Sequence, residues 1–273
     1  MNIKLDLDFA TQCFVDLAQS KGMDTKTFQE EFLMFFEPTT EQEDFNRGYE
    51  NLIKNFKLLE MAFQQKDLMT MNIALLFMRS TRLDTYFYNI TNGCYKVLKY
   101  DSRFQWPEIP QDYNLADYEH YDIHLRPQLL THPERLDKFQ TLMLEIAEYF
   151  GVDPNELKYG CKPGLQTAAW NLDYTLSLHD RITIDSTNML QAFLLHHLAM
   201  KENDLVTAQV GLMHAAVCAT HVEQTINNLI NDCDKMGIFD TRFEWPKLDN
   251  SPIPDHYQYD GYEVKKFKLP ETS

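Results

Sequence analysis

The chain contains an internal duplication, and this feature limits its architecture more than any other. Residues 89–107 and 228–246 share nine identities at a constant separation of 139 positions. In the first copy the shared residues are Asn89, Asn92, Cys94, Lys96, Asp101, Arg103, Phe104, Trp106 and Pro107. Chance does not place so many identities in so short a window, so the chain consists of two copies of one unit.

Weaker matches extend the duplication towards the N-terminus of each copy. Leu58 and Asp67 correspond to Leu195 and Asp204 at a separation of 137, and residues 17–24 correspond to residues 146–153 at a separation of 129. The sequence therefore predicts two units, residues 1–127 and 131–273, each of ordinary domain size. Two such units in one chain commonly form a pseudo-two-fold pair, the covalent counterpart of a symmetric dimer, and we expect that arrangement here.

Nearly every long segment has the apolar period of an α-helix. Phe9, Phe14 and Leu17 form one such stripe, and Asp153 followed by Pro154 is typical of a capped helix N-terminus. Strand-like alternation is confined to short pieces such as residues 262–267. The predicted fold class is all-α. The later helices are expected at residues 52–65, 68–79, 83–99, 187–201, 205–220 and 221–236.

An irregular segment follows the Trp-Pro pair of each copy. Residues 108–124 and 247–267 are rich in Pro, Asp and Tyr and have little helical period. Proline keeps such a chain extended, so each segment is predicted to be an arm that lies across helices with its tyrosines as anchors. Tyr113 and Tyr257 are equivalent anchors, and the helices that they contact belong either to their own unit or to the other one.

The charge of the chain limits its partners. The 41 acidic and 25 basic residues give a formal net charge of −16, while a hydrophobic content of 44% is typical of a packed globular protein. So negative a surface repels phosphate backbones, which disfavours direct nucleic-acid binding. It suits a protein that binds a basic protein surface, or one that presents carboxylates in place of phosphates.

The predicted compartment is the cytoplasm, with no membrane segment. No apolar run is expected to approach the ~18 residues that span a bilayer. Asp6, Asp8 and Asp16 stand where a signal peptide has basic and then apolar residues. The five cysteines are odd in number and lack CxxC spacing, which favours reduced thiols.

Two duplicated side-chain pairs are the candidate ligand- or partner-binding residues: Arg103 with Trp106, and Arg242 with Trp245. An arginine beside a tryptophan can hold an anionic or aromatic ligand by charge and stacking. The structural interpretation is favoured over this one. In it each arginine pairs with a nearby aspartate and each tryptophan anchors an arm. Tyr113 and Tyr257 complete the candidate set.

Other chemistries have little support in the sequence. Residues 146–157 have the outline of a helix-turn-helix, but their second helix lacks the basic and amide side chains that read DNA. His214 and His221 are about 10 Å apart along a helix, too far for one ion, so no metal site is predicted. No GxSxG, P-loop or HExxH motif occurs.

One resemblance bears on function. Asp67 and Asp204 begin equivalent helices, and an Asn- or Asp-rich turn precedes Lys96 and Lys235. In helix order and in these features the chain resembles the all-α, MazG-like nucleoside triphosphate pyrophosphatases. The resemblance implies Mg²⁺ bound by acidic residues on two helices. The corresponding residues here are not acidic: Lys54, Asn55, Leu58, Asn72 and Leu75, then Gln191, Leu195, Gln209 and Leu212. It therefore implies a member without catalysis, and no catalytic residue is assigned.

The predicted function is that of a non-catalytic, acidic interaction protein. In its concrete form it inhibits or regulates a basic or nucleic-acid-handling protein partner, and a viral, phage or mobile-element origin fits its composition. No cofactor is expected. A pyrophosphohydrolase that uses Mg²⁺, and a binder of a small anionic or nucleotide ligand, are the alternatives. Both a monomer and a homodimer agree with the sequence.

Overall fold

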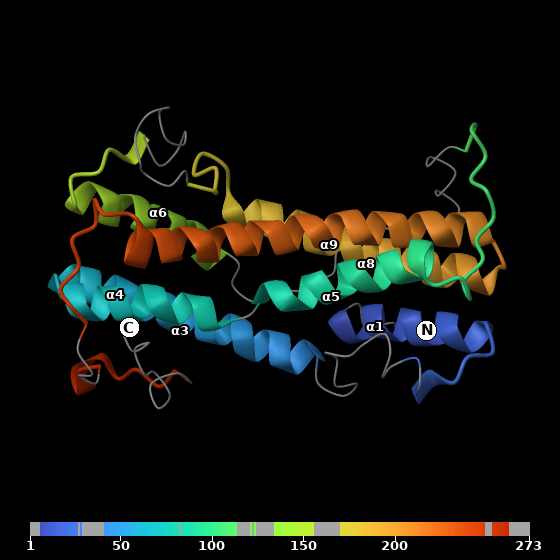
Figure 1. The fold of residues 1–273 in the computed structure, drawn as a ribbon, viewed down its shortest axis with the longest axis horizontal. Helices are drawn as coiled ribbons and strands as arrows, with labels where there is room; N and C mark the ends of the chain where they lie inside the picture. The colour runs from blue at the N-terminus through green and yellow to red at the C-terminus, as the bar shows by residue number, and fades with distance from the viewer. Residues whose placement is uncertain are drawn as a thin grey trace. The chain divides into compact units, whose positions relative to one another are not determined.

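The computed structural model describes residues 6–26, 28, 41–81, 83–113, 121, 123, 134–155, 170–248 and 253–261. No strand occurs among these residues, which confirms the all-α prediction. The strand-like residues 262–267 lie outside the described part of the chain. The long helices, drawn in Figure 1, are α1 (Leu7–Ser20), α3 (Glu41–Gln65), α4 (Leu68–Met78), α5 (Leu83–Tyr95), α6 (Glu134–Tyr149), α8 (Leu178–Lys201) and α9 (Leu205–Asp234).

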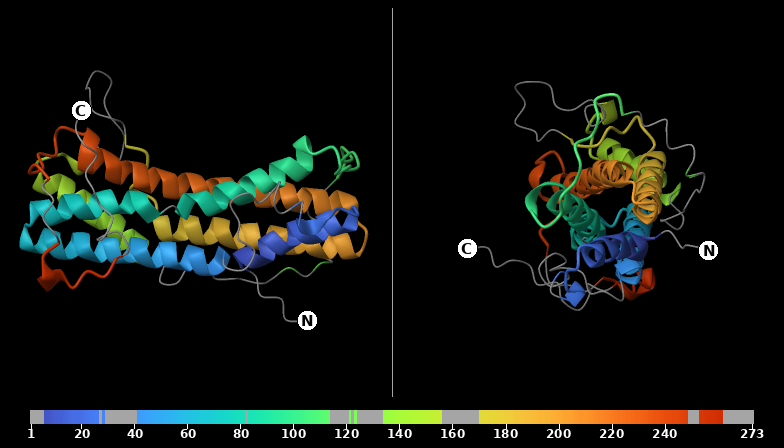
Figure 2. Two further views of the ribbon diagram at one scale, coloured as in Figure 1. Left: turned by 60° about the horizontal axis from the view of Figure 1, so that its bottom comes forward. Right: turned by 90° about the vertical axis from the view of Figure 1, so that its right-hand side faces the viewer.

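Equivalent polar residues set equivalent helix ends in the two copies. Asp67 caps α4 by accepting from the backbone N–H of Thr70 at 3.1 Å, and Asp204 caps α9 by accepting from that of Thr207 at 3.1 Å. The residue before each cap, Lys66 and Asn203, has a positive φ of 56° and 59°. The two copies therefore turn from one helix into the next through the same left-handed backbone conformation. In the first copy α4 folds back along α3, as Figure 2 shows.

The chain forms two compact units, and these are not its two sequential halves. Unit 1 consists of residues 1–45, 84–131 and 180–224, and unit 2 consists of residues 46–83, 132–179 and 225–273. Unit 1 combines α1 and α5 of the first copy with most of α8 and the first part of α9 from the second. Unit 2 combines most of α3 and all of α4 with α6 and the end of α9. Each unit thus contains helices from both copies.

In unit 1, α1 packs on α8. The rings of Phe14 and Phe193 meet edge to face with centroids 5.5 Å apart. Gly93 on α5 leaves room for the same ring, because a Cβ there would lie 3.0 Å from the tip of Phe14. Since Phe14 belongs to the first copy and Phe193 to the second, this core is built across the two repeats.

In unit 2, α3 packs on α6 in a corresponding way. The rings of Phe56 and Phe139 meet edge to face with centroids 5.4 Å apart. Phe56 and Phe193 occupy equivalent positions, 137 residues apart. Each of these two phenylalanines therefore packs on the first helix of the opposite copy.

One helix changes the sequence-based expectation about membranes. The helical stretch Leu205–Phe239 is long and apolar enough to cross a bilayer by length and composition. From Leu205 to Val222 it has no Asp, Glu, Lys or Arg, so the prediction that no run reaches this length was wrong. Half of its most apolar window is buried inside the protein, and buried core helices commonly have this composition.

Candidate functional site

A π-helical turn ends the last helix of each copy and positions the candidate residues. These turns, Lys96–Tyr100 (η2) and Lys235–Phe239 (η4), follow α5 and α9 directly. The backbone N–H of Asp101 closes the first by donating to the carbonyl of Lys96 at 2.9 Å. Asp240 closes the second in the same way at 2.8 Å. π-Helical turns are rare and often occur at functional sites, so their repetition makes this segment the natural place to look.

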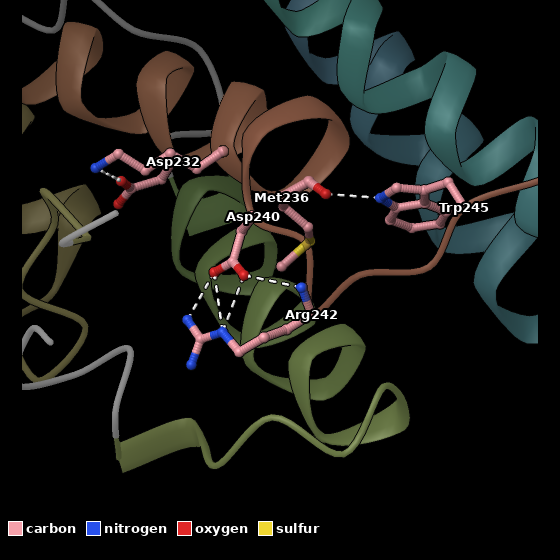
Figure 3. Close-up of polar contacts among 6 residues, drawn as sticks. Asp232, Met236, Asp240, Arg242 and Trp245 are labelled. Carbon is pink, nitrogen blue, oxygen red and sulfur yellow. Dashed lines mark hydrogen bonds and ion pairs between the residues drawn. The ribbon is translucent and has the colours of Figure 1, made fainter. Parts of the chain in front are cut away.

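Each candidate arginine is held by the aspartate two residues before it. Nε and Nη2 of Arg103 donate to the two carboxylate oxygens of Asp101 at 2.8 and 2.6 Å. Nε and Nη2 of Arg242 donate to those of Asp240 at 2.9 and 2.6 Å, as Figure 3 shows. In this bidentate geometry the guanidinium charge is neutralised within the chain.

The candidate tryptophans close the π-helical turns. The indole Nε1 of Trp106 donates to the carbonyl of Val97 at 2.8 Å. The indole Nε1 of Trp245 donates to the carbonyl of Met236 at 2.6 Å (Figure 3). Helix C-termini leave carbonyls without intrahelical partners, and each indole satisfies one of them.

The candidate tyrosines contact the helix start of the opposite copy. The hydroxyl of Tyr113 lies 2.9 Å from Oγ1 of Thr207 near the start of α9, within unit 1. The hydroxyl of Tyr257 donates to Oδ2 of Asp67 at 3.0 Å before the start of α4, within unit 2. The segment after each Trp-Pro pair therefore reaches helices of the other copy.

Two of these contacts shift the pKa of a carboxyl group. Arg103 holds the pKa of Asp101 below its usual value, because its hydrogen bonds outweigh the opposing effect of burial. Burial alone would raise the pKa of Asp67, but hydrogen bonds from Thr70 and Tyr257 lower it overall. Burial and the bond to Asp67 raise the pKa of Tyr257 to about 12. Both carboxylates are thus ionised and held within the fold at neutral pH.

All six candidate residues consequently have a structural partner within the chain. The geometry agrees with the structural interpretation, in which arginine pairs with aspartate and tryptophan anchors the following segment. The structure does not bring the two Arg/Trp pairs together within one compact unit, since Arg103 belongs to unit 1 and Arg242 to unit 2. Their role in binding a ligand or partner stays a prediction.

The remaining candidates have ordinary surroundings. His196 is buried, and Nδ1 of His221 lies 3.6 Å from Oδ1 of Asp185. Among the positions that resemble MazG-like proteins, Lys54 pairs with Asp260 at 3.1 Å and Asn55 donates to the carbonyl of Phe77 at 3.0 Å. Within the described residues, no group of three or more His, Cys, Asp or Glu side chains is arranged to hold a metal ion.

Sequence reasoning missed one duplicated surface feature. The last residue of each π-helical turn is an aromatic with most of its surface in solvent: Tyr100 is 78% exposed and Phe239 is 63% exposed. The two residues are 139 positions apart, the same separation as the conserved pairs around them. The alignment of the two copies contained this signal, but the residues differ in identity. They also lie just beyond the expected helices, residues 83–99 and 221–236, so helical period does not report their exposure.

The comparisons with known proteins add no relative: no family model, no curated protein and no solved structure matches the chain.

Proposed function

We propose that this is a non-catalytic, acidic interaction protein that binds a basic protein partner through two equivalent aromatic surfaces, one in each compact unit. The observation that carries the proposal is the exposure of Tyr100 and Phe239 at the same position of the two copies. A single exposed aromatic residue is ordinary on a protein surface, but exposure at the same position of both copies is a repeated feature. Aromatic residues are enriched among the anchors of protein interfaces.

The charge of the chain supports a basic partner. The net charge is −16, and exposed acidic side chains follow each aromatic in sequence: Glu108 and Asp112 in the first copy, Glu244 and Asp255 in the second. In an interface of this kind an aromatic anchor supplies affinity, and the overall negative charge of the chain steers association with a basic partner. Carboxylates of this kind favour a partner that ordinarily binds phosphates, such as a nucleic-acid-handling protein.

The duplication supports a regulatory role over an enzymatic one. A catalytic site needs convergent reactive groups, whereas a repeated anchor offers two binding surfaces on one chain. If both engage one partner or one dimeric partner, the second binding event is intramolecular and avidity strengthens the complex. A bivalent inhibitor or regulator is therefore the form of the function that we favour.

The test is binding to a partner captured from the native host and then purified. We expect its surface to be basic and its affinity to fall by at least about tenfold between roughly 50 and 200 mM salt. Replacing Tyr100 and Phe239 together by alanine should weaken binding by at least about tenfold, or about 1.4 kcal/mol. The matched control is Tyr88→Ala, which removes a ring that is 50% exposed but lies outside the two π-helical turns.

The proposal fails if the double variant binds as well as the unchanged protein, or if the purified partner is acidic. It also fails if the protein releases pyrophosphate from nucleoside triphosphates in a Mg²⁺-dependent manner, because this would establish the MazG-like alternative. Calorimetry measures the binding of the double variant, the sequence of the purified partner gives its charge, and a coupled assay measures pyrophosphate release.

A further inference from the structure

Unit 1 contains a cavity between α1 and α8 that is separate from the exposed aromatic residues. Its volume is about 190 Å³. Its lining comes from two facing helix segments: Cys13, Asp16, Leu17 and Ser20 on α1, and His196, His197, Met200 and Lys201 on α8. All eight residues belong to the same compact unit, so the cavity is a feature of unit 1 alone.

Two aromatic rings lie at the corresponding place in unit 2. The separations of the duplication pair Ser20 with Tyr149, and Met200 with Phe63. In unit 2 the rings of Phe63 and Tyr149 meet edge to face with centroids 5.9 Å apart. Unit 1 has smaller or more flexible side chains at both positions. The two units therefore differ in the side chains at this place, and the smaller or more flexible ones of unit 1 line the cavity.

His196 gives the cavity a hydrogen-bond acceptor, its ring nitrogen Nε2, to which no group in the described part of the chain donates. The side chain is 2% exposed, and its Nδ1 lies 2.9 Å from the carbonyl oxygen of Ala208, to which it must donate. Burial lowers the pKa of His196 to about 4, so the ring is neutral at pH 7 and Nε2 carries a lone pair. In the described part of the chain no donor is hydrogen-bonded to Nε2. The equivalent residue in the first copy is Leu59, in unit 2, and its side chain has no hydrogen-bonding group.

The more buried part of the lining is uncharged and mostly apolar. Burial, aided by the charge of Asp16, raises the pKa of Cys13 well above its usual value, so this thiol is not ionised. Its Sγ lies 3.8 Å from the carbonyl oxygen of Phe193, which accepts its weak hydrogen bond. Leu17 and Met200 contribute apolar surface, while the charged side chains of Asp16 and Lys201 are more exposed. The cavity therefore suits a neutral occupant.

We propose that this cavity binds a small, neutral, ring-shaped molecule that carries one O–H or N–H group to donate to Nε2 of His196. An apolar protein cavity of about 150 Å³ holds benzene, so the volume here admits one ring with a small substituent. The apolar walls supply the affinity and the imidazole selects the donor. Nε2 is accessible to water from the cavity, so a ligand that donates to it replaces a hydrogen bond to water with one inside the cavity.

The experiment compares phenol with benzene as probes of the full chain. Phenol has the donor and benzene lacks it, while their rings are alike. With ¹³C-methyl methionine, both probes should shift the methyl signal of Met200. Phenol should bind about three- to tenfold more tightly, because a hydrogen bond that replaces one to water gives a modest net gain. His196→Leu installs the residue of the other copy and should abolish the preference for phenol without preventing benzene binding.

A second pair of variants tests the location. Ser20→Tyr with Met200→Phe places the ring pair of unit 2 into unit 1 and should eliminate binding of both probes, followed by ligand-observed NMR. The matched control, Tyr149→Ser with Phe63→Met, leaves the cavity of unit 1 intact and should preserve it. Far-ultraviolet circular dichroism reports the fold. If the variant with Ser20→Tyr and Met200→Phe does not fold, the comparison of probe binding between His196→Leu and the unchanged protein tests the proposal by itself.

Three results would overturn the proposal: equal affinity for phenol and benzene in the unchanged protein, an undiminished phenol preference in His196→Leu, or no binding of either probe up to its solubility. Binding that persists in the folded, filled variant would equally show that the probes occupy another place. None of these results bears on the aromatic surfaces at Tyr100 and Phe239, so the two proposals fail or stand separately.

Discussion

At the scale of single residues, the indole N–H of Trp245 is predicted to stabilise the fold by closing a π-helical turn. Trp245→Phe keeps most of the ring but removes the donor to the carbonyl of Met236, and we expect a loss of about 1–2 kcal/mol in the free energy of unfolding. The equivalent variant of the first copy, Trp106→Phe, removes the donor to the carbonyl of Val97 and should cost a similar amount. Urea denaturation measures both, and unchanged stability of either variant would contradict the assignment.

His196 should make stability depend on pH in mildly acidic solution. Burial lowers its folded-state pKa to about 4, whereas an unfolded histidine has a pKa near 6.5. The unfolded chain therefore binds the proton first. The stabilisation is complete above about pH 6.5 and is lost as the pH falls towards 4, by about 2 kcal/mol at pH 5.

The check is a urea midpoint at pH 7 and at pH 5 for the unchanged protein and for His196→Leu. The variant should lose less stability between the two pH values than the unchanged protein does. An identical loss in both proteins would mean that His196 is accessible to protons in the folded state. His197, whose pKa is lowered less and which stays in place in both proteins, contributes equally to each.

At the scale of elements, the segment after each Trp-Pro pair should be coupled to a helix start in the opposite copy. Tyr257 donates to Asp67, which is ionised and also caps α4, so the hydrogen bond is charge-assisted. A double-mutant cycle with Tyr257→Phe and Asp67→Ala should give a coupling energy of about 1–2 kcal/mol. The cycle separates this bond from the capping effect of Asp67, and additive effects of the two substitutions would exclude the contact.

Much of this element structure could be predicted from the sequence. The caps Asp67 and Asp204 and the positive-φ glycines Gly22 and Gly151 follow local rules, so the starts of α4 and α9 and the ends of α1 and α6 match expectation. The expected break between residues 220 and 221 was wrong, because α9 continues from Leu205 to Asp234. The all-α class followed from helical period for the same reason. The charge partners of Arg103 and Arg242 were also within reach, since each aspartate is only two residues away.

Non-local features could not be predicted in this way. Similarity identifies Phe56 and Phe193 as equivalent, but it does not say which copy of the first helix each one packs against. Either choice buries the same residues in similar surroundings. The cavity beside His196 escaped prediction because it depends on the sizes of Ser20 and Met200 on two facing helices, which helical period does not report. The shape and polarity of a cavity are set by the side chains of both helices together, so neither helix alone predicts them.

At the scale of the whole molecule, the composition of the compact units resembles an exchange of segments between two repeats. Unit 1 takes α1 and α5 from the first copy and most of α8 from the second, and unit 2 takes the complementary set. Domain swapping gives each unit of a homodimer this composition. Duplication of a gene whose product formed such a dimer would give the present chain directly. The pseudo-two-fold relation between the repeats remains a prediction.

This composition predicts how fragments behave. Residues 1–127 contain α1, α3, α4 and α5 but neither α6 nor α8, so the rings of Phe14 and Phe56 lose their partners Phe193 and Phe139. We therefore expect that neither residues 1–127 nor residues 131–273 fold as a monomer. Losing one side of a core removes several buried aromatic contacts, each worth about 0.5–1.5 kcal/mol beyond area burial.

Mixed in equal amounts, the two fragments should form a one-to-one complex with the helical content of the full chain. Light scattering after size exclusion and circular dichroism measure these properties. A helical, cooperatively unfolding monomer of residues 1–127 would mean that each repeat closes on itself, and self-association of that fragment into a folded dimer would instead show that one repeat can supply both sets of helices.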